Sequence, residues 1–176
     1  MIARACQIRQ AAAAWHADPH ALHDFVAGRQ RVEVKSSIGP HRTHHFLLDQ
    51  LLPLHGTYTI IASSVLEESI TGTSIAGLGE QVLKRDELTA DLRDRVSQIL
   101  ALSLGRDWRK ARGVAFDTES AAARLRLYDA VTIPKVDPCL PVEVMDVQFR
   151  AELTEAIPMS SVELARQGGL FSALFR

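Results

Sequence analysis

Two acidic residues and a lysine near the start of the sequence have types and spacing suited to phosphate chemistry. Asp24 precedes Glu33 by nine residues, and Lys35 follows Glu33 by two. Paired carboxylates bind hard divalent cations such as Mg²⁺, which also takes water and phosphate oxygens as ligands. If the segment is a strand, Lys35 lies on the same face as Glu33, about 7 Å along it. That reach suits a bound water or a scissile phosphate, so the three residues predict metal-assisted hydrolysis of a phosphodiester.

A tight β-hairpin is the element that must bring the two carboxylates together. Residues 22–27 and 30–36 are both β-like runs, and Gly28-Arg29 lies between them. Glycine in the first position suits a two-residue type II′ turn, and this turn pairs 27 with 30, 26 with 31 and 25 with 32. One step further, Asp24 falls opposite Glu33 with the Cβ atoms about 5 Å apart. Facing carboxylates repel each other, and a bridging cation reverses that effect.

These residues resemble the motif of the PD-(D/E)XK nuclease superfamily. Asp24 is followed after nine residues by Glu33-Val34-Lys35, with His-Asp-Phe in place of Pro-Asp. The neighbouring sequences are similar, more narrowly, to a bacterial family of PD-(D/E)XK motif proteins long carried as a domain of unknown function. The similar stretches are His-Asp-Phe, Val-Glu-Val-Lys-Ser-Ser, His-His-Phe-Leu-Leu-Asp-Gln-Leu and, from residue 146, Asp-Val-Gln-Phe-Arg-Ala-Glu-Leu. The resemblance covers roughly residues 15–155.

The resemblance implies a restriction-endonuclease-like α/β fold, with a mixed sheet flanked by helices. It also implies a DNA endonuclease of the restriction or phage-defence type that depends on Mg²⁺ or Mn²⁺. By position, Asp24 and Glu33 would hold the metal with help from the Val34 carbonyl. Lys35 would orient the attacking water or stabilise the phosphate in the transition state.

Three arginines close to this motif are expected to contact the DNA backbone. Arg29 and Arg31 belong to the hairpin itself, and Arg42 follows it. Guanidinium groups bind phosphate oxygens and position a protein on nucleic acid without reading its sequence.

One departure from the superfamily pattern supports a second hypothesis. Members often add an acidic residue from the first core helix, but residues 1–17 contain neither Asp nor Glu. This segment therefore has the character of a shortened first helix. The alternative function is a non-catalytic nuclease-fold subunit that binds DNA or a partner protein of a defence complex.

A third hypothesis, a zinc-stabilised binding module, arises from a group of histidines. The candidates are His16, His20, His23, His41, His44 and His45. Neutral imidazoles are good zinc ligands. However, no cysteine is nearby, and adjacent residues such as His44 and His45 face opposite ways on a strand.

The rest of the sequence predicts one domain over residues 1–176, with a strand and helix extension from about residue 106. Helices are expected at 1–15, 74–84, 86–104 and 161–175, and further strands at 43–48, 57–65, 124–133 and 142–153. The run 57–65 is β-branched and apolar nearly throughout, which is typical of a central strand covered on both faces.

Composition excludes several other classes of protein. The 176-residue chain has 47% apolar and 23% charged residues, a composition that excludes a disordered protein. It has only two cysteines, which excludes a disulfide scaffold. The longest uncharged run, residues 50–66, is too short and too interrupted to cross a membrane, and residues 1–15 lack a signal-peptide core. We therefore expect a cytoplasmic protein, and the nuclease resemblance makes a homodimer a reasonable expectation.

Overall fold

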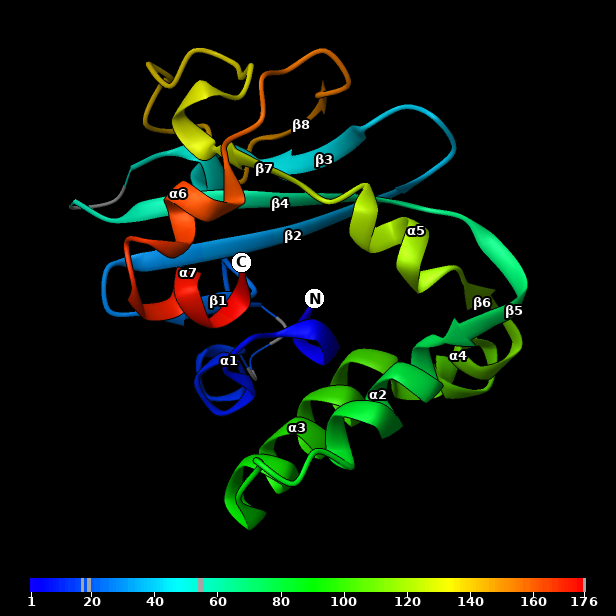
Figure 1. Cartoon of the computed structure of the whole chain (residues 1–176). Helices are drawn as coiled ribbons and strands as arrows, with labels where there is room; N and C mark the ends of the chain where they lie inside the picture. Colours follow the sequence, from blue (N-terminus) through cyan, green and yellow to red (C-terminus); the bar gives the residue numbers. More distant parts are fainter. Residues whose placement is uncertain (17, 19, 54–55, 176) are drawn as a thin grey trace.

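A four-stranded mixed sheet forms the centre of the computed structural model, which describes residues 1–16, 18, 20–53 and 56–175 (Figure 1). Its strand order is β1-β2-β4-β7, and the strands are β1 (Phe25–Ala27), β2 (Gln30–Ile38), β4 (Tyr58–Leu66) and β7 (Arg126–Asp129). β2 and β4 run parallel, whereas β1 and β7 pair antiparallel to their neighbours. The predicted mixed sheet flanked by helices is confirmed.

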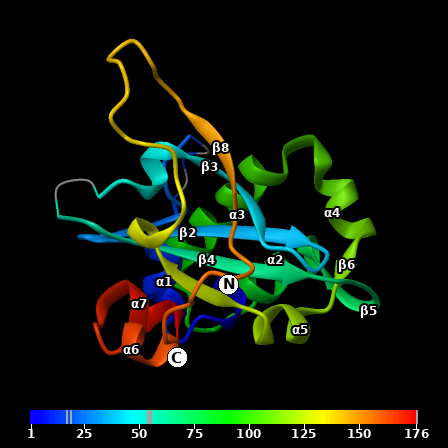
Figure 2. The same cartoon turned by 90° about the horizontal axis from the view of Figure 1, so that it is seen from above.

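Two small antiparallel sheets and a set of helices surround this sheet (Figures 1 and 2). The small sheets pair β3 (Thr43–Leu47) with β8 (Gln148–Glu152) and β5 (Glu68–Ser74) with β6 (Ala115–Phe116). The α-helices are α1 (Ile8–Ala14), α2 (Ile75–Leu83), α3 (Ala90–Leu104), α4 (Lys110–Gly113), α5 (Thr118–Ala123), α6 (Ser161–Ala165) and α7 (Gly169–Leu174). Single 3-10 turns are η1 (Ile2–Arg4), η2 (Leu48–Leu51), η3 (Gly105–Arg109) and η4 (Ala130–Thr132). Among the described residues, no helix has both the length and the apolar character that crossing a membrane requires.

The hairpin that was predicted to position the carboxylates is present with the predicted register. Phe25 pairs with Val32, Val26 with Arg31 and Ala27 with Gln30. Gly28 has a φ of 55°, a left-handed value that only glycine adopts at little cost. Arg29 does not share this positive φ, so the turn has the single left-handed residue of type II′.

β4 is buried on both faces, as its sequence predicts. Ile60 and Ala62 pack with Val32 of β2 in the core that α1 and α7 cover. Ile61 points the other way, into a core built with residues of β3, η2 and β7. Consecutive side chains of a strand alternate between faces, so an uninterrupted apolar run is needed where both faces are covered.

The helix that starts after Ser74 is confirmed, but the other three helix predictions were only partly right. The helix predicted over 1–15 is the 3-10 turn η1 followed by the shorter α1. Ser74 caps α2 by accepting a hydrogen bond from the Gly77 N–H. α3 begins at Ala90 rather than at residue 86, because Thr89 supplies the capping oxygen. The helix predicted over 161–175 is two short helices, since Gly168 before α7 and Gly169 at its first position adopt φ values of 70° and 58°.

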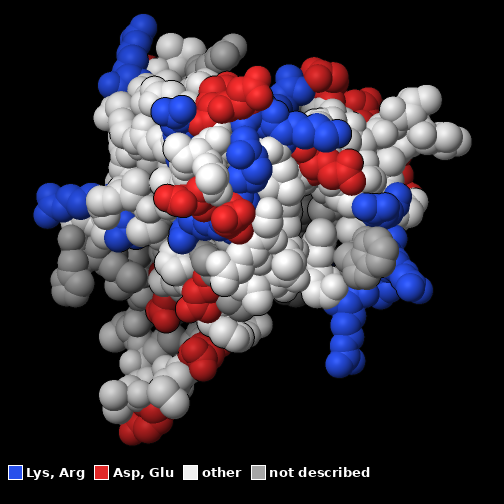
Figure 3. All heavy atoms as spheres, turned by 90° about the horizontal axis from the view of Figure 1, so that it is seen from below, with Lys and Arg blue, Asp and Glu red and all other residues white. Residues whose placement is uncertain are grey.

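The late strands are shorter than predicted. β8 has only five residues because it pairs with the five residues of β3. Upstream of it, residues 142–147 make no strand, and the Val144 N–H bonds back to the Pro141 carbonyl. The pairing of β5 with β6 was not predicted. On the face shown in Figure 3, basic and acidic side chains are interspersed, in keeping with a formal net charge of -1.

Candidate active site

The structure brings Asp24, Glu33 and Lys35 together at the junction of β1 and β2. Glu33 and Lys35 project from one face of β2, while Val32 and Val34 belong to the core on the other face. The Val34 N–H donates a hydrogen bond of 2.7 Å to Asp24 Oδ2. This bond fixes the Asp24 carboxylate against β2, immediately before β1 begins.

Glu33 and Lys35 form a largely buried ion pair. Lys35 Nζ lies 2.7 Å from Glu33 Oε1, and the side chains are 17% and 8% exposed, respectively. The ammonium group also lies over the Phe46 ring, 5.2 Å from its centroid. An amine placed over an aromatic face at this distance gains cation–π attraction, so Phe46 helps to fix where the Lys35 charge sits.

Burial perturbs both carboxylates, and the charge of Asp24 adds to the effect on Glu33. Desolvation, followed by the negative charge of Asp24, raises the pKa of Glu33 from 4.5 to about 7. Desolvation likewise raises the pKa of Asp24, against the lowering effects of the Val34 hydrogen bond and the Lys35 charge. Lys35 therefore compensates only part of the negative charge that the two carboxylates would carry together.

Gln50, in η2, joins the parts of the site, and the sequence did not reveal it. Its Nε2 donates to Glu33 Oε1 at 2.8 Å and to the Leu22 carbonyl at 3.1 Å. Its Oε1 accepts from Lys35 Nζ at 3.1 Å and from the Leu47 N–H at 3.2 Å. All four hydrogen-bonding positions of this buried amide are therefore used.

The donor atoms at the site fit a hard divalent cation. Asp24 and Glu33 offer carboxylate oxygens, and a cation between them would relieve the repulsion that raises the pKa of Glu33. In an extended strand the N–H and C=O of one residue point to the same side. Because the Val34 N–H bonds to Asp24, the Val34 carbonyl also lies on the Asp24 side of β2.

The six candidate histidines, all within the described part of the chain, do not assemble into a zinc site. Among the described residues, no three His, Cys, Asp or Glu side chains converge as metal ligands would. His44 is buried with Nε2 2.8 Å from Ser63 Oγ, and burial is the main cause that lowers its pKa to about 4. His45 is exposed on the opposite face of β3, where it pairs with Arg150 of β8.

The three candidate arginines differ in their surroundings. Arg29 is exposed in the hairpin turn, and Arg31 Nη1 bonds to the Gly28 carbonyl at 2.7 Å. Arg42, by contrast, is 4% exposed, and its Nη1 donates to the Ser63 carbonyl and hydroxyl at 2.8 and 3.0 Å. Its Nη2 donates to the Arg124 carbonyl. The DNA contact expected of Arg42 is corrected on these grounds, because its guanidinium is bonded inside the protein.

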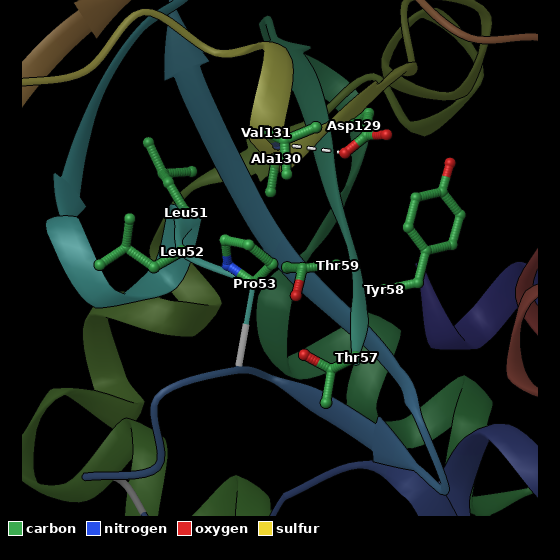
Figure 4. A pocket seen from close by; sticks show the side chains of 9 residues that line it. All are labelled: Leu51, Leu52, Pro53, Thr57, Tyr58, Thr59, Asp129, Ala130 and Val131. Carbon is green, nitrogen blue, oxygen red and sulfur yellow. Dashed lines mark hydrogen bonds between the residues drawn. The ribbon is translucent and has the colours of Figure 1, made fainter. Parts of the chain in front are cut away.

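A separate hollow lies near η2 but does not contain these residues (Figure 4). It is bordered by residues of η2, β4 and η4, and the Val131 N–H donates a 3.0 Å hydrogen bond to Asp129 Oδ1 at its edge. With a volume of about 20 Å³, it has room for a single water molecule. The surface at Asp24 and Glu33 remains the candidate active site.

A comparison with models of protein families finds one match that includes this site. Residues 1–154 match the family described as "Putative PD-(D/E)XK family member, (DUF4420)". The matched range includes Asp24, Glu33, Lys35 and Gln50, and it ends just after β8. Neither the curated proteins nor the solved structures contain a match.

The raised pKa of Glu33 predicts a distinctive pH dependence of stability in metal-free protein. Between pH 4.5 and 7 the folded state keeps a proton that the unfolded state has lost, so stability falls as pH rises through this window. Glu33→Gln cannot titrate and escapes this loss. The difference in free energy of unfolding between the variant and the parent should therefore grow, in favour of the variant, by on the order of 3 kcal/mol from pH 4.5 to pH 7.

Urea denaturation of both proteins at several pH values measures this difference. His44 has the opposite effect, because its lowered pKa makes stability rise with pH from about 4 to 6.5. It is present in both proteins and cancels in the comparison. A constant difference between parent and variant from pH 4.5 to 7 would contradict the assigned pKa.

Gln50→Ala is expected to destabilise the protein by about 1–3 kcal/mol, since it leaves buried donors and acceptors without a partner. Urea denaturation at neutral pH checks this value. Asp49→Ala is the matched control, because Asp49 is the exposed neighbour of Gln50 in η2 and should change stability by no more than about 0.5 kcal/mol. Equal effects of the two substitutions would argue against the role given to the Gln50 amide.

Proposed function

Because the chain belongs to the DUF4420 family of PD-(D/E)XK-type proteins, we propose that it is a metal-dependent nuclease that cleaves DNA. The observation that carries this proposal is the half-buried Asp24 beside the buried Glu33, with Lys35 paired to Glu33. PD-(D/E)XK nucleases generally use divalent metals, and the oxygen donors here suit Mg²⁺ or Mn²⁺. We place the activity in restriction or phage defence, on the basis of the sequence resemblance.

Each residue of the site has a distinct role in this proposal. Asp24, Glu33 and the Val34 carbonyl would hold the metal. A bound divalent ion lowers the pKa of its water and neutralises charge on the phosphate. Lys35 Nζ, held by Glu33, Gln50 and Phe46, would orient the attacking water or stabilise the phosphate charge. Gln50 bonds to Glu33, to Lys35 and to the Leu22 carbonyl, and so links both side chains to the segment that precedes Asp24.

Arg29 and Arg31 are proposed as the nearby phosphate contacts. Arg29 is exposed at the turn of the hairpin, and Arg31 leaves β2 on the same face as Glu33. Burial lowers the pKa of His23, the neighbour of Asp24, and the Arg31 charge lowers it further. The Arg31 guanidinium is therefore close enough to act electrostatically on a residue next to Asp24.

The second candidate is a non-catalytic subunit that binds DNA or a partner protein. It is favoured by the sequence of residues 1–17, which includes α1 and contains no acidic residue that could complete the site. It is also favoured by Glu33 Oε1, which already accepts hydrogen bonds from both Lys35 and Gln50. Metal binding and cleavage, measured separately, distinguish the two candidates.

Metal binding is expected to raise the melting temperature of the parent protein. At a concentration 100-fold above Kd, Mg²⁺ or Mn²⁺ should add about 2.7 kcal/mol to the free energy of unfolding. Asp24→Asn preserves an acceptor for the Val34 N–H but removes the charge, so it should lose this gain. Asp49→Asn, at an exposed acid outside the site, should keep it. Equal shifts in the parent and Asp24→Asn would refute the metal site.

Lys35→Ala is expected to lower cleavage of plasmid or single-stranded DNA by at least about 100-fold. The matched control is Lys84→Ala, at an exposed lysine just after α2, which should cut as the parent does. Undiminished cutting by Lys35→Ala would overturn the assigned mechanism. If the metal stabilises the parent but neither protein cuts, the non-catalytic candidate is supported.

A further inference from the structure

Residues 134–147 form a protruding loop between η4 and β8, which we call the prong. Figure 2 shows it extending away from the rest of the chain. Five of its large apolar side chains are exposed: Val136, Leu140, Val142, Val144 and Met145. The most accessible are Val142 and Met145, at 89% and 79%. Apolar side chains gathered on a protrusion mark a site of protein interaction.

The prong is held in shape by its own bonds. Val144 N–H bonds to the Pro141 carbonyl and Leu140 N–H to the Pro138 carbonyl, both at 2.9 Å. At its base, Lys135 Nζ donates to the Val131 carbonyl at 2.7 Å. Each of these bonds reduces the conformational entropy that the loop would lose on binding.

The charge of the prong argues against nucleic acid as its partner. It carries Asp137, Glu143 and Asp146 but only one cation, Lys135. Acidic side chains are visible along the protrusion in the space-filling view (Figure 3). DNA phosphates would be repelled, so the chemistry fits a protein groove that is apolar inside and basic at its rim.

The chain itself has a groove of that kind between α2, α3 and α4. The groove has a volume of about 210 Å³, and Ile75, Leu83, Leu100 and Leu104 line it. Glu80 and Arg112 also line it and form an ion pair at 3.6 Å. Directly beside it, η3 and α4 carry four cations against one acid: Arg106, Arg109, Lys110 and Arg112 against Asp107. With Glu80 included, four cations face two acids, so the surroundings of this apolar groove keep a positive net charge that complements the acidic prong.

The prong of one chain is not placed to fill its own groove. Figure 1 shows the prong beyond β3 and β8, whereas α2 and α3 lie on the opposite side of the four-stranded sheet. We propose that the prong of one copy docks into the groove between α2, α3 and α4 of a second copy. The two contacting surfaces differ, so the contact is head-to-tail and leaves one prong and one groove available for further copies.

Sedimentation equilibrium of the purified chain tests this contact without reference to any enzymatic activity. At about 100 µM, where an interface with a Kd of roughly 10 µM is mostly formed, the average mass should exceed the 19.4 kDa of one chain. Met145→Asp on the prong and Ile75→Asp in the groove should each reduce association. Ile75 is 43% exposed at the first position of α2, where an acidic residue is well tolerated. The control is Ile157→Asp, at a position that is 89% exposed and lies outside both surfaces.

Mixing the two variants gives the decisive result. Met145→Asp retains a working groove and Ile75→Asp a working prong, so an equal mixture should form a dimer of twice 19.4 kDa and nothing larger. A parent protein that stays at 19.4 kDa would overturn the proposal. Association of the parent that either variant leaves intact, or variants that fail to complement each other, would overturn it as well.

Discussion

Two carboxylates taken out of water beside a single lysine are the constraint on which this structure depends. Burial alone favours the protonated form of each acid, and their mutual repulsion adds to that effect on Glu33. Lys35 supplies one positive charge, which cannot balance two negative ones. When both acids are ionised the site carries an excess of negative charge, and a divalent cation is the natural complement to it.

The elements around the site hold this unfavourable arrangement in place. β2 is anchored on one side by the hairpin to β1 and on the other by its parallel pairing with β4. Val34 fixes Asp24 through its N–H, and Gln50 fixes Glu33 and Lys35 through its amide. Burying the carboxylates lowers the free energy of unfolding. The apolar core around β4, which is buried on both faces, offsets this loss.

Local sequence patterns were sufficient to predict the hairpin register, the buried strand β4 and the start of α2. These features depend on near neighbours: a turn glycine, side-chain alternation and a capping serine. Gln50 and Arg42 could not be assigned in this way, because their partners lie far along the chain. In the sequence Gln50 looks like any surface glutamine, because the fold alone brings it into contact with Glu33, 17 residues away. Arg42 became internal because Ser63 and Arg124 converge on it.

The most direct test of the metal site is a ¹³C NMR titration of the Glu33 carboxyl, with and without Mg²⁺, assigned with Glu33→Gln. Without metal, the carboxyl should titrate with a pKa of about 7. With saturating Mg²⁺, its pKa should fall well below that value, because a bound cation favours the ionised form. A pKa that Mg²⁺ leaves unchanged would contradict the assignment of Asp24 and Glu33 as metal ligands.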